Sequence, residues 1–524
     1  MTSRRHLLLA LLAVASASPS AFAANADLLA RLRRTEQEDG RVMETAALLC
    51  DRVGPRLTGS PQARAASELA RQRLAGWGLS NVHLERWDFG RGWNVERCAV
   101  HMISPATAPL MATPKAWSVG TRGPVRGPAV HVRLRSEADF AQWHGQISKK
   151  VVFLGEVAAA TEHDPSQPRR WTDEGLAALR TPGGPEQPNA RDFQARERLR
   201  EHLLSFFAKE GALAVIESGG AGSGTYLVVR PLDLIQLQRS PGPPALTMAG
   251  EHFGQIVRLL DSGTPVQVEL DVRTAFYEDD LTSANVIAEL PGTDLADEIV
   301  MLGAHLDSWH GGTGATDNAA GVAAAMEALR LLKLAGVSPR RTIRLALWTG
   351  EEQGLLGSRA YTAAHLGHRA EPRDELTRAL PFFWRPLAGA LSTKPDLARF
   401  DAYFNLDYGT GRIRGIYLDG DTAAAPLLRA WLAPLADLGA VVVSPRFHVG
   451  SDHQSFESLG LPAFAFIQDE MDYLARTHHT NMDVLERLEP DDLAQASVVA
   501  AWVLYRAATS DERVPRPTLP KDKP

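Results

Sequence analysis

The chain is poor in cysteine: among its 524 residues it has only Cys50 and Cys98, and neither belongs to a Cys-x-x-Cys pair. This scarcity argues against a metal site built from thiolates. The two side chains could form a disulfide if the protein is exported to an oxidising compartment. Two buried free thiols explain them equally well, because cysteine is among the most frequently buried residues.

The sequence also lacks features that mark several other classes of protein. It has no run of basic residues and a net charge of −6, which argues against a nucleic-acid binder. It has no Gly-x-Ser-x-Gly motif, which marks the nucleophile of many serine hydrolases. Beyond the first residues, no apolar stretch reaches the roughly 20 residues needed to span a membrane. With 44% hydrophobic residues, the chain is long enough for two or three domains with separate cores.

The N-terminus has the pattern of a signal peptide. Arg4 and Arg5 precede an apolar run over residues 7–14, and an Ala-Phe-Ala sequence ends at Ala23. A charged start, a short apolar run and a small-residue end are typical of a cleaved secretory signal. We therefore expect residues 1–23 to be removed, and the mature protein to be soluble and exported to the periplasm or the extracellular space.

The rest of the chain divides into two regions of alternating helices and strands and a β-rich region between them. Helical and strand-like segments alternate before about residue 114 and again after about residue 275. This alternation predicts an α/β fold with a mixed, mostly parallel sheet covered by helices on both faces. Between these parts lie short β-rich segments and a polar, proline-rich span. The predicted divisions are a signal peptide (1–23), a first part of the α/β domain (24–114), an inserted β-rich domain (115–275), a second part of the α/β domain (276–511) and a flexible tail (512–524).

Residues able to hold metal ions follow three of the predicted strands. His305 and Asp307 come after one apolar strand, Glu351 and Glu352 come after another, and Asp407 ends a third. Because open α/β sheets bind ligands at the carboxyl ends of their strands, we expect these side chains to converge. Ionised carboxylates beside buried structure are costly unless they are paired or bound to metal. A carboxylate-rich centre with two divalent ions activates water and stabilises an oxyanion, so the pattern indicates a metallohydrolase.

Five motifs, in order along the chain, resemble those of the M28 family of zinc peptidases, and most closely its plasma glutamate carboxypeptidase subgroup. The motifs contain His305 with Asp307, Asp317, Glu351 with Glu352, Asp407, and His479. The likeness covers nearly the whole mature chain and implies that the inserted region is a protease-associated domain. It also implies two zinc ions per chain and a substrate that is a short peptide.

The resemblance implies which residue binds which ion. His305 and Asp407 would bind one zinc ion, and Glu352 and His479 would bind the other. Asp317, in Asp-Asn-Ala-Ala-Gly, would bridge both ions, and in relatives the peptide bond after this aspartate is often cis. A water molecule would lie between the two ions.

The resemblance also implies roles for residues around the ions. Asp307 would orient the first histidine ligand, and Glu351 would take a proton from the bridging water and deliver it to the departing amine. His453 corresponds to a residue that faces the substrate carbonyl in relatives, so it would stabilise the oxyanion. A structural histidine at the start of a helix is the alternative. His478 precedes the last ligand and is either an extra hydrogen-bond donor or a packing residue.

The direction of hydrolysis stays open at this point. Most bacterial members of the family are called aminopeptidases, which favours release of an N-terminal residue, and a dipeptidase or a carboxypeptidase of the subgroup's type is the alternative. Glutaminyl cyclases share the fold but typically use one zinc ion. A catalytically dead binding protein is a further alternative, against which the complete ligand set and Glu351 argue. The partner implied is a peptide substrate, and a homodimer is compatible with the resemblance.

Overall fold

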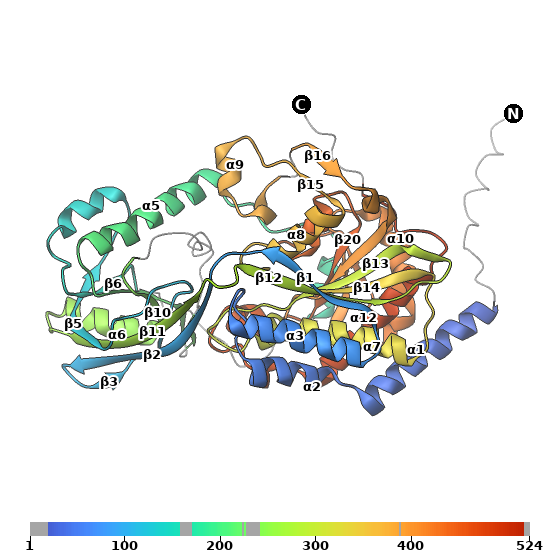
Figure 1. Ribbon diagram of the computed structural model, residues 1–524, viewed down its shortest axis with the longest axis horizontal. Helices are drawn as coiled ribbons and strands as arrows, with labels where there is room; N and C mark the ends of the chain where they lie inside the picture. Colours follow the sequence, from blue (N-terminus) through green and yellow to red (C-terminus); the bar gives the residue numbers. More distant parts are fainter. Residues whose placement is uncertain (1–18, 158–169, 223–224, 227–241, 387–388, 518–524) are drawn as a thin grey trace.

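The computed structural model describes residues 19–157, 170–222, 225–226, 242–386 and 389–517 (Figure 1). The molecule has a larger lobe, which contains both ends of the described chain, and a smaller lobe. Each lobe is built on an eight-stranded sheet. Among the described helices, none is both long and apolar enough to cross a membrane. Most of the predicted signal peptide lies outside the described residues, and helix α1 (Pro19–Asp39) begins just before its expected end.

A mixed sheet with a parallel centre forms the larger lobe. The four central strands β14, β13, β17 and β20 run parallel to one another, whereas β12 pairs antiparallel with β14 and β1, and β18 pairs antiparallel with β20. The mixed α/β architecture confirms the fold class predicted from the alternation of segments. The order across the sheet is β1 (Ser80–Asp88), β12 (Thr282–Leu290), β14 (Arg341–Trp348), β13 (Leu295–His305), β17 (Phe400–Asn405), β20 (Ala463–Gln468), β18 (Ile413–Tyr417) and β19 (Val442–Ser444).

Helices cover both faces of this sheet, so its strands are apolar along their whole length. In strand β14, Leu345 points into the core on one face and Trp348 into the core on the other. On the second face, α8 (Leu356–His365) and α11 (His453–Glu457) contribute Tyr361 and Phe456. The helices on the first face are α1, α2 (Val42–Ala47), α3 (Pro61–Gly76), α7 (Ala320–Leu334), α10 (Ala425–Leu432) and α12 (Pro490–Thr509).

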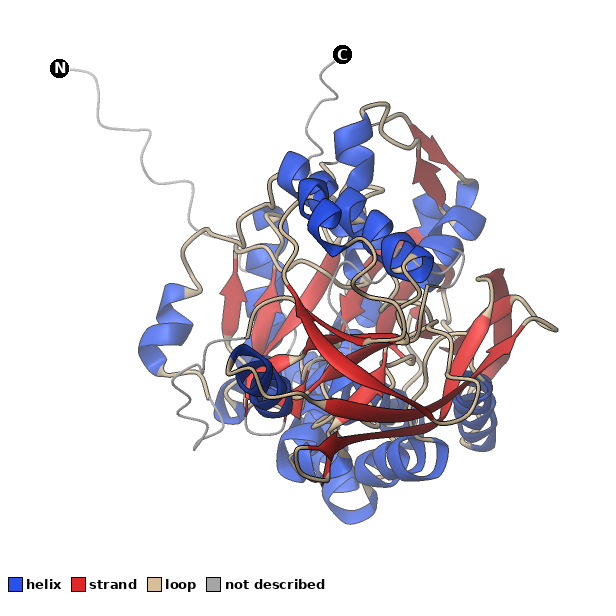
Figure 2. Ribbon diagram, turned by 90° about the vertical axis from the view of Figure 1, so that its left-hand side faces the viewer, coloured by secondary structure: helices blue, strands red, loops and turns tan. Residues whose placement is uncertain are grey.

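The smaller lobe contains the second sheet, and Figure 2 views the molecule from its side. Helices α5 (Ala190–Lys209) and α6 (Gly250–Asp261) pack against this sheet. Three strands before residue 115 also belong to it, so the sheet extends beyond the insertion predicted at 115–275. The assignment of this lobe as a protease-associated domain stays a prediction. The strand order is β3 (Ala108–Pro109), β2 (Gly92–Ser104), β11 (Gln267–Tyr277), β5 (Val125–Val132), β6 (Val151–Leu154), β7 (Ala214–Ser218), β10 (Ala245–Met248) and β4 (Ala112–Pro114).

Shorter elements connect these layers. The polar, proline-rich span contains a short helix after residue 170, and its first part lies outside the described residues. The short elements are the π-helical turn Leu48–Val53, α4 (Asp173–Ala178), β8 (Gly220–Gly222), β9 (Thr225–Tyr226), β15 (Gly367–Arg369), α9 (Glu375–Ala379) and β16 (Leu391–Thr393).

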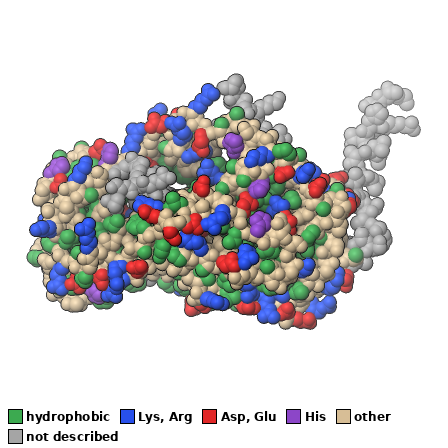
Figure 3. All heavy atoms as spheres, viewed as in Figure 1, with side chains coloured by type: hydrophobic (Ala, Val, Ile, Leu, Met, Phe, Trp, Pro, Cys, Tyr) green, Lys and Arg blue, Asp and Glu red, His purple; other side chains and the backbone are tan. Residues whose placement is uncertain are grey.

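The two cysteines lie in different lobes and are both free. Cys50 belongs to the core beneath the large sheet, and Cys98 lies on β2 of the smaller lobe. Burial raises the pKa of each thiol to about 11, so neither is a reactive thiolate at neutral pH. The structure therefore agrees with the free-thiol alternative. Acidic and basic side chains are mixed over the face shown in Figure 3, as the absence of basic runs suggested.

Candidate metal centre

The predicted site residues lie at the carboxyl edge of the parallel strands. His305 is the last residue of β13, Glu351 and Glu352 follow β14, and Asp407 follows β17. Strands β14, β13 and β17 are direct neighbours, so their ends bring these side chains together. Four of the chain's predicted site residues thus converge because of sheet topology alone.

One group of side chains gathers around His305. Its Nε2 atom lies 3.1 Å from Oδ1 of Asp317 and 3.1 Å from Oδ1 of Asp407. The ligand atoms of these three residues all lie within 4.8 Å of one another. His305 is only 1% exposed, so the cluster is shielded from bulk water.

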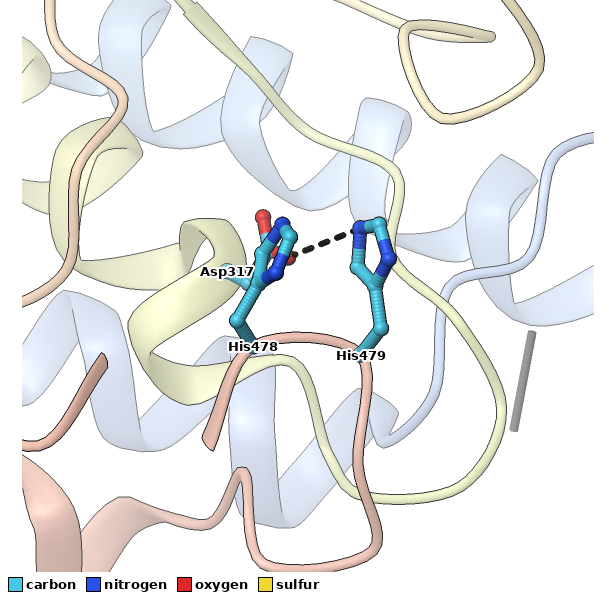
Figure 4. A group of neighbouring side chains, drawn as sticks. All are labelled: Asp317, His478 and His479. Atoms are coloured by element: carbon cyan, nitrogen blue, oxygen red, sulfur yellow. Dashed lines mark ion pairs between the residues drawn. The ribbon is translucent and has the colours of Figure 1, made fainter. Parts of the chain in front are cut away.

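A second group gathers on the other oxygen of the same aspartate. Nε2 of His479 lies 3.4 Å from Oδ2 of Asp317 and 2.9 Å from Oε2 of Glu352. Nε2 of His478 is farther from that oxygen, at 4.0 Å. Figure 4 shows the two imidazoles rising from one loop toward the Asp317 carboxylate. The two oxygens of Asp317 therefore face two different sets of side chains.

The backbone around Asp317 is held by buried polar contacts. Asp317 lies in the π-helical turn Ala315–Ala319, and its peptide bond to Asn318 is cis, as in relatives of the resembled family. The Asn318 amide donates to the carbonyl of Leu406 over 2.8 Å. The carboxylate of Asp483 accepts hydrogen bonds from the backbone N–H of Thr316 at 2.6 Å and of Asp317 at 3.2 Å. The bridging position is thus fixed from both sides.

Arg56 supports the same turn, and sequence reasoning did not single it out. Its side chain is fully buried and donates to backbone carbonyls, among them those of Leu306, Thr313 and Gly314, each at 2.7 Å. A guanidinium group suits this position because it offers five donors in one plane. Arg56 therefore ties the strand that carries His305 to the turn that carries Asp317.

Asp307 contacts both the first histidine and the loop that carries the two glutamates. Nδ1 of His305 lies 3.0 Å from the backbone carbonyl of Asp307 but 3.7 Å from its carboxylate. The carboxylate instead accepts hydrogen bonds from the Thr58 hydroxyl at 2.9 Å and from the backbone N–H groups of Glu351 and Glu352 at 3.3 and 3.4 Å. Its side chain therefore positions mainly the loop that carries the two glutamates, while its carbonyl orients the histidine.

The residues present fit a divalent metal centre. Oδ2 of Asp317 and Oε1 of Glu352 are buried and have no hydrogen-bond partner. Buried carboxylate oxygens left in this state are costly, and a cation offsets that cost. Burial raises the pKa of Glu352 and lowers that of His479, so the imidazole is neutral, as a metal ligand must be. A mixture of imidazole and carboxylate donors suits zinc and other first-row divalent ions.

Glu351 also lies in this buried edge, with 8% of its surface exposed. Burial raises the pKa of its carboxyl group well above the ordinary range, and the charges of His305 and Asp407 act on it. It therefore lies close to the group around His305 without being one of the residues paired there. A group in this place can exchange a proton with a water molecule at the centre.

His453 lies in a buried part of this edge. Its side chain is fully buried, and its Nε2 atom lies 3.1 Å from the backbone carbonyl of His448. The burial agrees with the alternative of a structural histidine, and the contact with the substrate carbonyl stays a prediction. His448, which is partly exposed and packs its ring against Tyr408 at 5.7 Å, is the more accessible histidine of this segment.

These features define the class of the protein. The larger lobe is an α/β domain with a histidine- and carboxylate-lined centre, fit for divalent metal ions, at the carboxyl edge of its sheet. This is the arrangement expected of a metallohydrolase.

Comparison with known proteins shows which family the chain is similar to. Residues 285–503 match the model of peptidase family M28. The chain is 28% identical to carboxypeptidase Q of Bos taurus over 481 residues, which covers 91% of this chain and 87% of the relative. It is 27% identical to carboxypeptidase Q of Homo sapiens with the same coverage. Residues 285–503 thus match an M28 peptidase domain, which confirms the resemblance inferred from the motifs and supports a hydrolase.

Solved structures agree with this assignment. A peptidase M28 precursor from Shewanella amazonensis superposes with a TM-score of 0.67 at 25% identity, covering 95% of this chain and all of that one. A zinc aminopeptidase from Bacillus subtilis superposes with a TM-score of 0.57 at 19% identity, covering 90% of this chain and 95% of that one. The second likeness concerns the fold alone.

Proposed function

We propose that the protein is a dinuclear zinc exopeptidase that hydrolyses short peptides, with release of the N-terminal residue. The observation that carries this proposal is the position of Asp317, whose two carboxylate oxygens face two separate sets of side chains. A single carboxylate placed in this way can bridge two ions. The resemblance of the motifs to the M28 zinc peptidases, whose bacterial members are mostly called aminopeptidases, supports both the choice of metal and the direction.

The chain's residues divide between the two ions as follows. His305 and Asp407 would hold one ion, Glu352 and His479 the other, and Asp317 both. When bound, such a pair of ions lowers the pKa of a water molecule and stabilises the charge that develops on the scissile carbonyl oxygen. Both histidines offer Nε2, and Nδ1 of His305 is held by a backbone carbonyl, which fixes its tautomer.

Glu351 would move the proton during hydrolysis. Its carboxylate takes a proton from the attacking water and later gives it to the departing amine. Asp307 supports this step, because it accepts the backbone N–H of Glu351 at 3.3 Å and so fixes the position of the base. The buried edge around both residues excludes bulk water, which strengthens the electrostatic interactions of the site.

A large cavity begins beside the centre and would receive the substrate. It has a volume of about 1360 Å³, and Gln353, the residue directly after Glu352, belongs to its wall. Aromatic side chains, including Trp87, Phe89 and Trp384, line it. A mostly apolar cavity with a few polar groups is typical of a site for small molecules or short peptides.

The same cavity supports a second candidate, a carboxypeptidase. Arg359 belongs to the wall, with its guanidinium carbon 4.3 Å above the ring of Phe382. Its acidic neighbour Glu371 is 3.5 Å away and also pairs with Arg385 at 2.7 Å. A guanidinium group in this position suits the C-terminal carboxylate of a peptide. The name carboxypeptidase Q of the relatives also favours this candidate.

Peptides with blocked ends distinguish the candidates. We expect the purified, zinc-loaded protein to cleave a peptide with a free N-terminus and an amidated C-terminus, and to spare the same peptide when it is N-acetylated and has a free C-terminus. The reverse pattern identifies a carboxypeptidase, and cleavage of dipeptides alone identifies a dipeptidase. Formation of pyroglutamate from peptides that begin with glutamine would move the assignment to a cyclase. Chelation should abolish cleavage, and Zn²⁺ should restore it.

We also propose that the protein is exported, as its N-terminal pattern predicts. Sequencing the N-terminus of the protein recovered from the periplasm or medium of an expressing bacterium should give Ala24 as the first residue. A product that stays inside the cell and begins at residue 1 or 2 would contradict this proposal.

A further inference from the structure

A second cluster of potential metal ligands lies behind the catalytic edge. Asp419 follows strand β18, and His453 and Glu457 lie one turn apart on helix α11. One ligand atom from each residue lies within 4.8 Å of the others. Residues four apart on a helix face the same side, so α11 presents its imidazole and its carboxylate together.

This cluster contains buried polar atoms that nothing in the described structure satisfies. Oδ2 of Asp419 and Nδ1 of His453 are buried without a hydrogen-bond partner. The Asp419 side chain is 1% exposed, and its Oδ2 atom lies 3.9 Å from Nε2 of His453. An unsatisfied buried carboxylate oxygen costs free energy unless a cation or a proton compensates it.

The electrostatic surroundings also favour a cation here. Burial raises the pKa of Asp419 and of Glu457 well above the ordinary range, and in Glu457 the charges of Asp419 and Asp421 add to the effect. Burial lowers the pKa of His453 to about 3, so its imidazole is neutral. Two acidic groups, Asp419 and Glu457, therefore lie beside one neutral imidazole, and a divalent ion would compensate their charge.

We propose that Asp419, His453 and Glu457 bind a further divalent transition-metal ion, separate from the catalytic centre. One imidazole and two carboxylates suit Zn²⁺ or Mn²⁺, whereas Ca²⁺ prefers oxygen ligands throughout. His453 is already held in place, because its Nε2 atom lies within hydrogen-bond distance of the His448 carbonyl. Such an anchor on a metal-binding imidazole is common.

The structure offers a path for the ion. Glu457 belongs to the wall of the large cavity that opens beside the catalytic centre, so one of the three ligands is reached from that cavity. The other two lie deeper, with side chains that are at most 1% exposed. An ion can therefore enter along the cavity and be enclosed by the deeper ligands.

The ion would stabilise the segment that leads to the catalytic centre. It would join the loop after β18 to the start of α11, and Ser451, two residues before His453, donates a hydrogen bond to the predicted ligand Asp407. The role is therefore one of positioning: the ion fixes the segment from which Ser451 reaches the centre. Its loss should lower thermal stability and have a smaller effect on turnover.

Anomalous diffraction on crystals of the wild-type protein soaked in Zn²⁺ tests the proposal directly. We expect a peak at the zinc edge among Asp419, His453 and Glu457, at the roughly 2.0–2.2 Å typical of zinc bound to nitrogen or oxygen. A map without this peak overturns the proposal. Peaks beside Asp317 belong to the catalytic centre and are judged separately, so either site can be refuted without the other.

Metal analysis in solution provides the second test. Glu457→Gln should contain one zinc ion fewer per chain than the wild type after dialysis against Zn²⁺. Glu371→Gln is the matched control, because Glu371 lies in the wall of the same cavity but outside the cluster. Equal zinc content in Glu457→Gln and the control would contradict the proposal. Asp419→Asn, with the same expected loss, replaces Glu457→Gln if that variant does not fold.

Discussion

The hydroxyl group of Ser451 donates a hydrogen bond to Oδ2 of Asp407, with 2.5 Å between the oxygen atoms. The same hydroxyl accepts a hydrogen bond from the side-chain amide of Asn405 at 2.7 Å. One oxygen of Asp407 is thereby held by Ser451 while the other, Oδ1, points to His305. A chain of buried hydrogen bonds thus sets the orientation of a predicted zinc ligand.

Replacing Ser451 by alanine should weaken the centre without unfolding the protein. Asp407 would lose the donor that orients it, and losing such a supporting partner costs about tenfold to a hundredfold in metal affinity or activity. Zinc affinity and kcat of Ser451→Ala measure this effect. Ser455→Ala is the control, since the Ser455 hydroxyl is also buried but contacts that of Ser358 instead. Equal losses in both variants would mean that packing, and not the contact with Asp407, is responsible.

Asp307→Asn should lower turnover, because the Asp307 carboxylate accepts hydrogen bonds from one hydroxyl group and two backbone N–H groups that position the glutamate loop. The amide has one acceptor oxygen, and its NH₂ group would face the donors of Thr58, Glu351 or Glu352. We expect kcat to fall about tenfold to a hundredfold, within the range for groups that support a metal centre. Thr58→Val, which removes one of the same donors, should give a smaller fall. An unchanged kcat in Asp307→Asn would show that the loop holds its position without this carboxylate.

The sequence predicted the metal-binding residues at the edge of the sheet better than the residues that hold them in position. His305, Glu352 and Asp407 could be placed together because apolar strands precede them and parallel strands end at one edge. Arg56 and Ser451 lie far from those motifs in the chain. Their contacts depend on how loops cross, for which no local pattern exists.

The burial of His453 could not be predicted for a related reason. The motif indicates that a histidine lies near the site, but burial depends on helix α11, which turns that side chain away from solvent. Asp483 was not singled out from the sequence, although it lies four residues after the predicted ligand His479. The structure shows what this acid does: it accepts the N–H groups of Thr316 and Asp317.

Glu351→Gln should abolish nearly all turnover while zinc remains bound. Removal of a general base lowers the rate by about 10²–10⁴-fold, and glutamine keeps the size and the neutral polarity of the protonated acid. Glu352→Gln is the matched comparison: the same change one residue later removes a predicted ligand, so zinc content should fall with activity. Metal analysis and kcat for both variants provide the measurement. Near-normal turnover in Glu351→Gln would assign the proton transfer to another group.

The two adjacent histidines should respond differently to replacement by alanine. Nε2 of His479 lies 2.9 Å from Glu352 and 3.4 Å from Asp317, whereas Nε2 of His478 lies 4.0 Å from Asp317. His478 also packs its ring against Tyr473 at 4.9 Å. We therefore expect His479→Ala to lose zinc and activity, and His478→Ala to keep its zinc with a smaller change in KM or kcat. The opposite order would make His478 the ligand.

Arg56→Lys should destabilise the fold and disturb the turn that carries Asp317. The buried guanidinium donates to the carbonyls of Leu306, Thr313 and Gly314, and the ammonium group of lysine cannot reproduce a planar fork with five donors. We expect the free energy of unfolding to fall by at least about 1.5 kcal/mol, the contribution of one hydrogen bond from a charged donor. Urea unfolding measures the change, and zinc affinity reports on the turn. Arg97→Lys is the control, because Arg97 is about half exposed and pairs with Asp271 on the surface of the smaller lobe. If both variants unfold at the wild-type urea concentration, the contacts of Arg56 contribute little net stability, and the position of Asp317 must depend on Asp483 and the sheet.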